Sequence, residues 1–282
     1  MARGGRSPRG DAGRRPPWRD LTALAFVGAL LWGVTFLPPD TTLAEVRDGG
    51  VLRACVPTSS PPLVQDDPDR PGIDVELLRA IADGLGVRLL LVENEAMGRD
   101  FNPRNWRVTR AQCLVLAGGI VDATITRSFL VVTPPHLETG WAAVVGDPAP
   151  TSLVGTTVGF YSGLTGLDRL ALSRWLREQG ADVALVRDVD GAQAALERGE
   201  VDLVVTEALG ARSLAERTGG DAVWLPTPDG RVPIALGLWK GDLTLERAVV
   251  DEVRRLQREG FVEDLVDAYA LAPLQETCPF CR

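Results

Sequence analysis

The sequence has a single histidine, four cysteines and two methionines among its 282 residues. One histidine without a neighbouring cysteine cluster offers too few ligands for a metal site, so we expect neither a metal nor another cofactor. Four cysteines are also too few for a small scaffold held together by disulfides. The composition, 45% hydrophobic and 24% charged, is that of a globular chain long enough for one large domain or two modest ones.

Positive charge is scarce outside the N-terminal tail. The net charge is -8, but the first 39 residues hold six arginines and two aspartates, which leaves the rest with 36 acidic and 24 basic residues, a net charge of -12. A body this acidic repels a phosphate backbone, so nucleic acid is excluded as a partner.

A basic tail precedes an uncharged run over residues 21–37, which is followed by Pro38-Pro39. Positive charge before an apolar run is typical of an export signal, and it keeps the tail in the cytoplasm and the body outside. The run is at the lower length limit for a membrane span, and Thr42-Leu43-Ala44 is a poor cleavage site. An uncleaved transmembrane anchor is therefore slightly favoured over a cleaved signal peptide.

Two similar α/β units follow along the chain. The patterns predict strands separated by helices, which is typical of an α/β fold with parallel sheets. The first unit has expected strands at 51–57, 88–93 and 121–126, with helices at 73–87 and 106–117. The second has expected strands at 156–163, 181–187 and 201–207, with helices at 164–180 and 190–199.

One phrase occurs in both units. GGIVDATITR (118–127) and RGEVDLVVTE (198–207) share a Val-Asp pair and a Thr, and they end in opposite charges, Arg127 and Glu207. We therefore expect twin strands in equivalent places of two lobes. Extended apolar segments at 138–148 and 232–242 predict two crossings between the lobes, and 243–271 predicts two amphipathic helices.

Six pieces in this order resemble the bacterial extracellular solute-binding proteins of family 3, which bind polar amino acids. They include GIDVELLRAIADGLGV, HLETGWAAVV, GTTVGFYSGLTG and AQAALERGEVDLVVTE. The resemblance covers 51–271 and implies a two-lobed periplasmic-binding-protein type II fold that closes over a small solute. The expected boundaries are a tail and helix at 1–44, lobe 1 at 45–143 and 236–277, lobe 2 at 144–235, and a C-terminal tail at 278–282.

The resemblance also implies ligand-binding residues in the second lobe. Thr165, with Gly163 and Leu164, lies at the turn before a helix, whose free N–H groups would receive a ligand carboxylate. The alternative is that Thr165 only caps the helix. Glu207 stands where relatives bind the ligand's ammonium group, and the alternative is a solvated carboxylate at a strand end.

The first lobe departs from the family pattern. Arg127 would bind the ligand's carboxylate or pair with another acidic residue. The loop that contains Arg127 is shorter than in the family. Ser59 and Ser60 stand where an aromatic residue is usual, so Trp106 or Phe101 would supply a stacking surface, unless they pack in the core.

Other residues have structural interpretations. Asp74 is expected to cap its helix, and His136 to lie at a hinge entry. Arg104, Arg107 and Arg110 are expected on a solvated helix face. A disulfide between Cys55 and Cys113 is expected, and the C-x-x-C pair Cys278 and Cys281 is expected to form a small structural disulfide rather than a redox or zinc site.

The resemblance favours a monomeric, extracytoplasmic protein that captures an amino-acid-like or carboxylate ligand for the membrane permease of an ABC transporter. An accessory or sensory protein of the cell envelope, such as those associated with quinoprotein dehydrogenases, is the alternative, with a protein partner. A dehydratase on the same fold is disfavoured because Gly210 stands where those enzymes carry a catalytic glutamate. No other acid–base pair is evident, so the chain is not expected to be an enzyme.

Overall fold

The computed structural model describes residues 17–34, 40–97, 103–146, 148–161, 167–228, 230–269 and 274–281. The chain forms two compact units, residues 1–40 and 41–282. The first contains helix α1 (Pro17–Val34). Among the described residues, no helix is long and apolar enough to cross a membrane. Residues 35–39, the end of the apolar run and the prolines after it, lie outside the described part.

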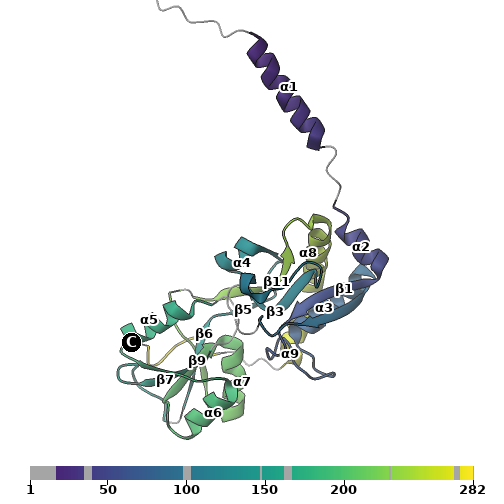
Figure 1. Cartoon of the computed structure of the whole chain (residues 1–282). Helices are drawn as coiled ribbons and strands as arrows, with labels where there is room; N and C mark the ends of the chain where they lie inside the picture. The colour runs from purple at the N-terminus through teal and green to yellow at the C-terminus, as the bar shows by residue number, and fades with distance from the viewer. Residues whose placement is uncertain are drawn as a thin grey trace, which may run out of the picture. The chain divides into compact units, whose positions relative to one another are not determined.

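The larger unit is built on two separate mixed sheets (Figure 1). The first has the order β2-β1-β3-β11-β4, and β5 pairs with β11. Strand β1 is parallel to β2 and β3, whereas β11 runs antiparallel to its neighbours. Its strands are β1 (Val51–Val56), β2 (Arg88–Glu93), β3 (Val115–Val121), β4 (Leu130–Val132), β5 (Leu137–Thr139) and β11 (Val232–Trp239).

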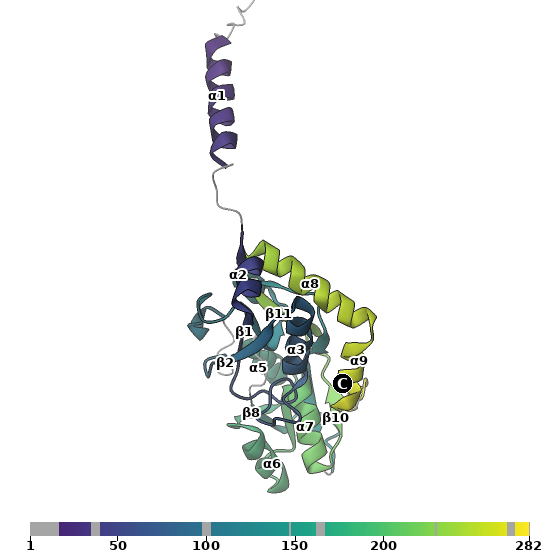
Figure 2. The ribbon, with the colours of Figure 1, turned by 90° about the vertical axis from the view of Figure 1, so that its right-hand side faces the viewer.

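Helix α3 covers the buried face of this sheet and packs against α8 and α9, as Figure 2 shows. Alternate residues of β1, among them Leu52 and Ala54, are completely buried beneath it. Burial of such apolar side chains is the main stabilising contribution to the lobe. The helices of this lobe are α2 (Thr42–Gly49), α3 (Ile73–Leu85), the 3-10 helix η1 (Pro103–Trp106), α4 (Thr124–Phe129), α8 (Leu243–Arg258) and α9 (Phe261–Ala268).

The second sheet has the order β10-β6-β9-β7-β8. Strand β7 is parallel to β8 and β9, and β6 runs antiparallel to β9 and β10. Its elements are β6 (Trp141–Val145), β7 (Thr157–Phe160), α5 (Arg169–Glu178), β8 (Asp182–Leu185), α6 (Val189–Glu197), β9 (Leu203–Glu207), α7 (Ala208–Thr218) and β10 (Ala222–Trp224). The predicted α/β fold with two sheets flanked by helices is confirmed.

The chain crosses between the sheets at Gly140, between β5 and β6, and again between β10 and β11. The first crossing lies inside the expected segment 138–148, which contains the end of β5 and all of β6. The second crossing comes before the expected segment 232–242, because β11 already belongs to the first sheet. The C-terminal residues depart further from the expected boundaries. Gln275 pairs with Val223 of the second sheet, so the chain returns there after α9.

Two predicted elements of the first lobe are wrong. Residues 106–117, expected to be helical, contain the end of η1, a turn and the start of β3; residues 121–126, expected to be a strand, contain the end of β3 and half of α4. Gly118 and Gly119 both have φ +91°, which glycine adopts readily and other residues rarely. The strand therefore runs through these glycines and ends at Val121.

Disulfides join Cys55 to Cys113 and Cys278 to Cys281. The first closes a loop with a sequence separation of 58, so on the chain-entropy account it contributes about 4 kcal/mol by restricting the unfolded chain. The second has a separation of 3, for which the same account gives only about 2 kcal/mol. Global stability therefore depends more on the first disulfide.

Candidate functional site

Glu207 ends β9 at the junction between the two sheets. Its carboxylate accepts hydrogen bonds from the backbone N–H of Leu209 at 2.8 Å and of Gly210 at 2.5 Å, which caps helix α7. The hydroxyl of Thr139, the last residue of β5, donates to the same carboxylate at 3.1 Å. Because Thr139 belongs to the first sheet and Glu207 to the second, this contact joins the lobes beside the first crossing.

Burial sets the electrostatics of this carboxylate. Glu207 is 3% exposed, and burial raises its pKa to about 7, although the backbone N–H groups and Thr139 act in the opposite direction. Loss of water disfavours the charged form, whereas hydrogen bonds to the carboxylate favour it. The carboxyl group of Glu207 therefore titrates near neutral pH. A cation that comes close would favour its ionised form.

Tyr161, which directly follows β7, lies beside Glu207. Its hydroxyl donates to the carbonyl oxygen of Gly210 at 3.3 Å. Burial raises the pKa of Tyr161, and the charge of Glu207 adds to the shift. Helix α7 also carries Arg212, whose pKa is lowered, mainly by burial, while Glu207 acts in the opposite direction. Sequence reasoning missed Tyr161, Thr139 and Arg212; the position of Tyr161 at the end of a strand was the only available signal.

Arg127 lies on helix α4 rather than at a strand end. Its Nε and a terminal nitrogen donate to the two oxygens of Asp122 at 2.5 and 2.6 Å, a bidentate ion pair. Asp122 raises the pKa of Arg127, and the Arg127 side chain is 63% exposed. In the structure Arg127 thus pairs with an acidic residue, the alternative to a ligand carboxylate, and that residue is Asp122.

The twin phrases do not occupy equivalent places. Asp122 follows the C-terminal end of β3, whereas Asp202 precedes the N-terminal end of β9 and accepts from the backbone N–H of Thr157 at 2.7 Å. The expectation of twin strands with two matching ends is therefore wrong. The reason is that the first strand is shifted toward the N-terminus, through Gly118 and Gly119.

The remaining predicted ligand residues are dispersed. Ser59 is exposed and Ser60 half-buried in a turn after β1, where the Ser60 backbone pairs with Val64. Trp106 is 2% exposed in a core cluster with Cys55 and Cys113, which favours core packing over a stacking surface.

Gly163, Leu164 and Thr165 lie outside the described residues, as does Phe101. Helix α5, expected from residue 164, begins at Arg169. Its first N–H groups are already occupied, because the Asp168 carboxylate accepts from Leu170 and Ala171, each at 2.9 Å.

A buried pair, Asp74 and His136, supports the first crossing. Asp74 does not cap its helix as predicted; its carboxylate accepts from the backbone N–H of Gly118 at 2.7 Å and of Gly119 at 3.1 Å. The other oxygen lies 2.7 Å from His136 Nε2. His136 is thus positioned at the start of the crossing and tied to the same glycine turn that shapes β3.

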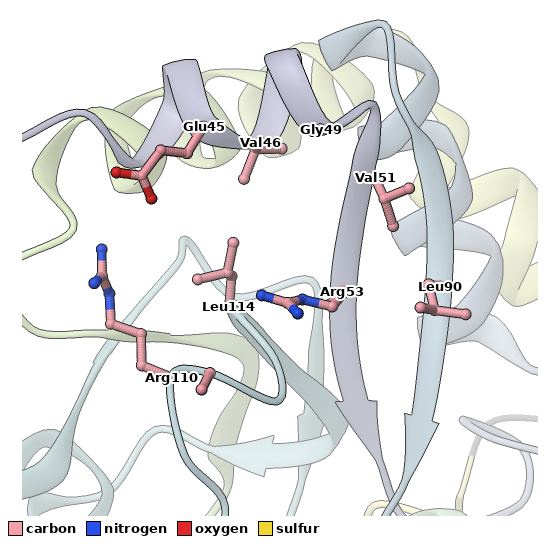
Figure 3. A pocket seen from close by; sticks show the side chains of 9 residues that line it. Glu45, Val46, Gly49, Val51, Arg53, Leu90, Arg110 and Leu114 are labelled. Carbon is pink, nitrogen blue, oxygen red and sulfur yellow. The ribbon is translucent and has the colours of Figure 1, made fainter.

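A hollow of about 800 Å³ lies on the first lobe, between α2 and the N-terminal half of β1 (Figure 3). Arg53 points into it, and Leu90 beside it is 50% exposed. Arg110, expected on a helix face, lies in a loop and is paired with Asp242 at 2.7 Å. The hollow contains none of the predicted ligand-binding residues, and it lies away from the C-terminal end of β1 where Ser59 and Ser60 follow.

No family model matches this chain. It is similar to several solved structures of binding proteins. A Streptococcus pneumoniae amino acid ABC transporter substrate-binding protein bound to L-arginine is 20% identical, with a TM-score of 0.63 over 82% of this chain and 99% of that one. A mutant of ArgBP from T. maritima is 23% identical, with a TM-score of 0.62 over 81% and 98%. The chain thus has the fold of these binding proteins.

Curated relatives carry an enzyme name. The chain is 24% identical over 266 residues to a membrane-bound lytic murein transglycosylase F from Pseudomonas putida, a match that covers 85% of this chain and 50% of the relative. A protein of the same name from Pseudomonas savastanoi is 25% identical over 207 residues, 69% of this chain and 40% of the relative. The chain spans about half the length of the curated relatives it matches, or less.

Proposed function

We propose that this chain is an extracytoplasmic solute-binding protein that captures a small amino-acid-like or carboxylate ligand between its two lobes. In this proposal it delivers the ligand to the membrane permease of an ABC transporter. The observation that carries the proposal is the two-sheet fold with a buried carboxylate, Glu207, at the junction of the lobes. The fold matches nearly the full length of solved amino-acid-binding proteins.

Glu207 would bind the ligand's ammonium group. A buried carboxylate whose pKa is raised to about 7 is destabilised as an anion until a cation compensates it. Binding of an ammonium group would therefore lower the pKa of Glu207 and release its proton. Thr139 and helix α7 already hold the carboxylate in place, so its orientation would not change on binding.

The ligand's carboxylate would be bound by Arg127; Gly163, Leu164 and Thr165, the other residues predicted to bind it, lie outside the described residues. A guanidinium binds a carboxylate through two parallel hydrogen bonds, the geometry that Arg127 makes with Asp122. The ligand would thus exchange with Asp122. Arg127 is 63% exposed, but the Asp122 side chain is only 11% exposed, so the exchange leaves a largely buried carboxylate without its partner and the ligand has to offset that cost.

The proposal assigns no catalytic step to the chain. At Gly210, where related dehydratases carry a glutamate, an added Cβ would lie 2.8 Å from the Glu207 carboxylate and 3.2 Å from the Tyr161 hydroxyl. A larger, charged side chain does not fit there without displacing both groups.

The test is a panel of amino acids, amines and small carboxylates, screened by thermal shift, because a ligand that binds only the native state raises Tm. A hit is then titrated by calorimetry at pH 6.5 in buffers of different ionisation enthalpy. An ammonium-bearing ligand should release protons with the wild type and release none with Glu207→Gln. Arg127→Ala should abolish binding, and it should also lower Tm without ligand because Asp122 loses its partner. Absence of any shift across the panel would contradict the proposal.

A further inference from the structure

The C-terminal segment forms a third connection between the lobes. Helix α9 is held to the first lobe by Tyr269, whose hydroxyl accepts from the Gly72 N–H and donates to Glu76, each at 2.7 Å. The described chain resumes at residue 274 against the second lobe. There the backbone of Gln275 accepts from the Trp224 N–H and donates to Ala222, each at 3.0 Å, and so forms an isolated parallel bridge beside β10.

Phe280 fastens this segment to the second lobe. It is 1% exposed and belongs to the same core cluster as Val223 and Leu225. Cys278 and Cys281 flank it, and their disulfide holds the chain in the tight turn that directs Phe280 inward. Arg231, next to the second crossing, pairs with Glu276 and lies 4.4 Å from the ring centroid of Trp224.

This disulfide is accessible, in contrast to the other one. Both Cys278 and Cys281 are half-buried and line a hollow of about 400 Å³, together with Trp224 and Arg231. Cys55 is 1% exposed and Cys113 is completely buried. Because thiol–disulfide exchange requires a thiolate to reach a sulfur atom, only the C-terminal pair can react in the folded protein.

We propose that Cys278–Cys281 is a site of thiol–disulfide exchange whose reduction releases the C-terminal segment from the second lobe. The co-reactant is a dithiol. Its first thiolate attacks one sulfur, forming a mixed disulfide and displacing the other cysteine as a thiolate; its second thiol then displaces the first cysteine. The dithiol is oxidised to a disulfide, and Cys278 and Cys281 gain two electrons and two protons. Without the covalent turn, Phe280 leaves the core and the bridge between Gln275 and β10 opens.

The experiment uses the full chain treated with dithiothreitol under native conditions. Free thiols are trapped with N-ethylmaleimide and located by mass spectrometry, and amide hydrogen exchange is followed in parallel. Alkylation is expected at Cys278 and Cys281 alone. Exchange of the Trp224 and Gln275 amides should accelerate by on the order of tenfold or more, because locally opened amides lose protection, and reoxidation should restore the slow rate.

Two variants keep the disulfide intact. Phe280→Ala should accelerate hydrogen exchange at the Trp224 and Gln275 amides as reduction does, because it removes the buried phenyl ring that packs the C-terminal segment into the core. Pro279→Ala, a change at the exposed neighbour, should leave exchange unchanged. The proposal is overturned if both disulfides are reduced together, or if Cys278 and Cys281 are reduced selectively while these amides exchange as slowly as before.

Discussion

At the scale of single residues, Glu207 shows how burial changes the chemistry of a predicted side chain. The sequence predicts its place at a strand end, and the structure adds the α7 cap and the contact with Thr139. Its ordinary pKa of 4.5 rises to about 7 in the folded chain. The folded state therefore binds the proton more tightly than the unfolded state, and this favours folding at low pH.

Stability measurements against pH test this shift. The contribution of the Glu207 proton is fully present below pH 4.5 and is lost as the pH rises through about 7. Relative to Glu207→Gln, the wild type should thus lose roughly 3 kcal/mol in its free energy of unfolding between these pH values. Urea denaturation of both proteins from pH 4.5 to 8 measures the difference. A difference that stays constant across this range would mean that Glu207 titrates normally.

Arg127 shows what sequence leaves open for a single residue. Its positive charge and the two alternatives, a ligand carboxylate or an acidic partner, follow from the residue type. The choice of Asp122 depends on the turn between β3 and α4, which brings two residues five positions apart into bidentate contact. A strand over 121–126 would hold Asp122 and Arg127 apart. The wrong prediction of a strand there therefore gave no indication that Asp122 is the partner of Arg127.

At the scale of elements, the course of β3 depends on two glycines. Gly118 combines a φ of +91° with a position where an added Cβ would lie 2.2 Å from Pro57 Cδ. The N–H groups of Gly118 and Gly119 both bind the Asp74 carboxylate. The periodicity of apolar residues does not reveal such a backbone, because it reports which face a side chain takes and not the sign of φ.

Alanine substitutions at Gly50 and Gly118 separate the cost of backbone strain from the cost of steric overlap in the free energy of unfolding. Gly50→Ala should cost about 1–2 kcal/mol, because Gly50 has φ +64° but open space around it. Gly118→Ala should cost at least about 2 kcal/mol more, since overpacking against Pro57 is added to the backbone strain. Chemical denaturation of the two variants provides the comparison. Equal costs would show that Pro57 moves aside freely.

At the scale of the whole molecule, residues 41–282 contain both sheets and their shared core cluster. A unit with its own core is expected to fold by itself. A chain of residues 41–282 should therefore melt in a cooperative transition, followed by circular dichroism, with the second lobe stabilised through both crossings and the C-terminal return. A broad melt without a cooperative step would show that this unit is incomplete.

The sequence by itself predicted the α/β class with two sheets flanked by helices and the paired C-terminal helices, because side-chain periodicity and turn residues act locally. Only the tertiary structure decided that Arg127 pairs with Asp122, that Glu207 binds Thr139, and that the chain returns to the second sheet at Gln275. These contacts join groups from separate elements. Their partners are selected by packing, and several alternatives of the same charge or polarity lie along the chain, so local pattern could not choose among them.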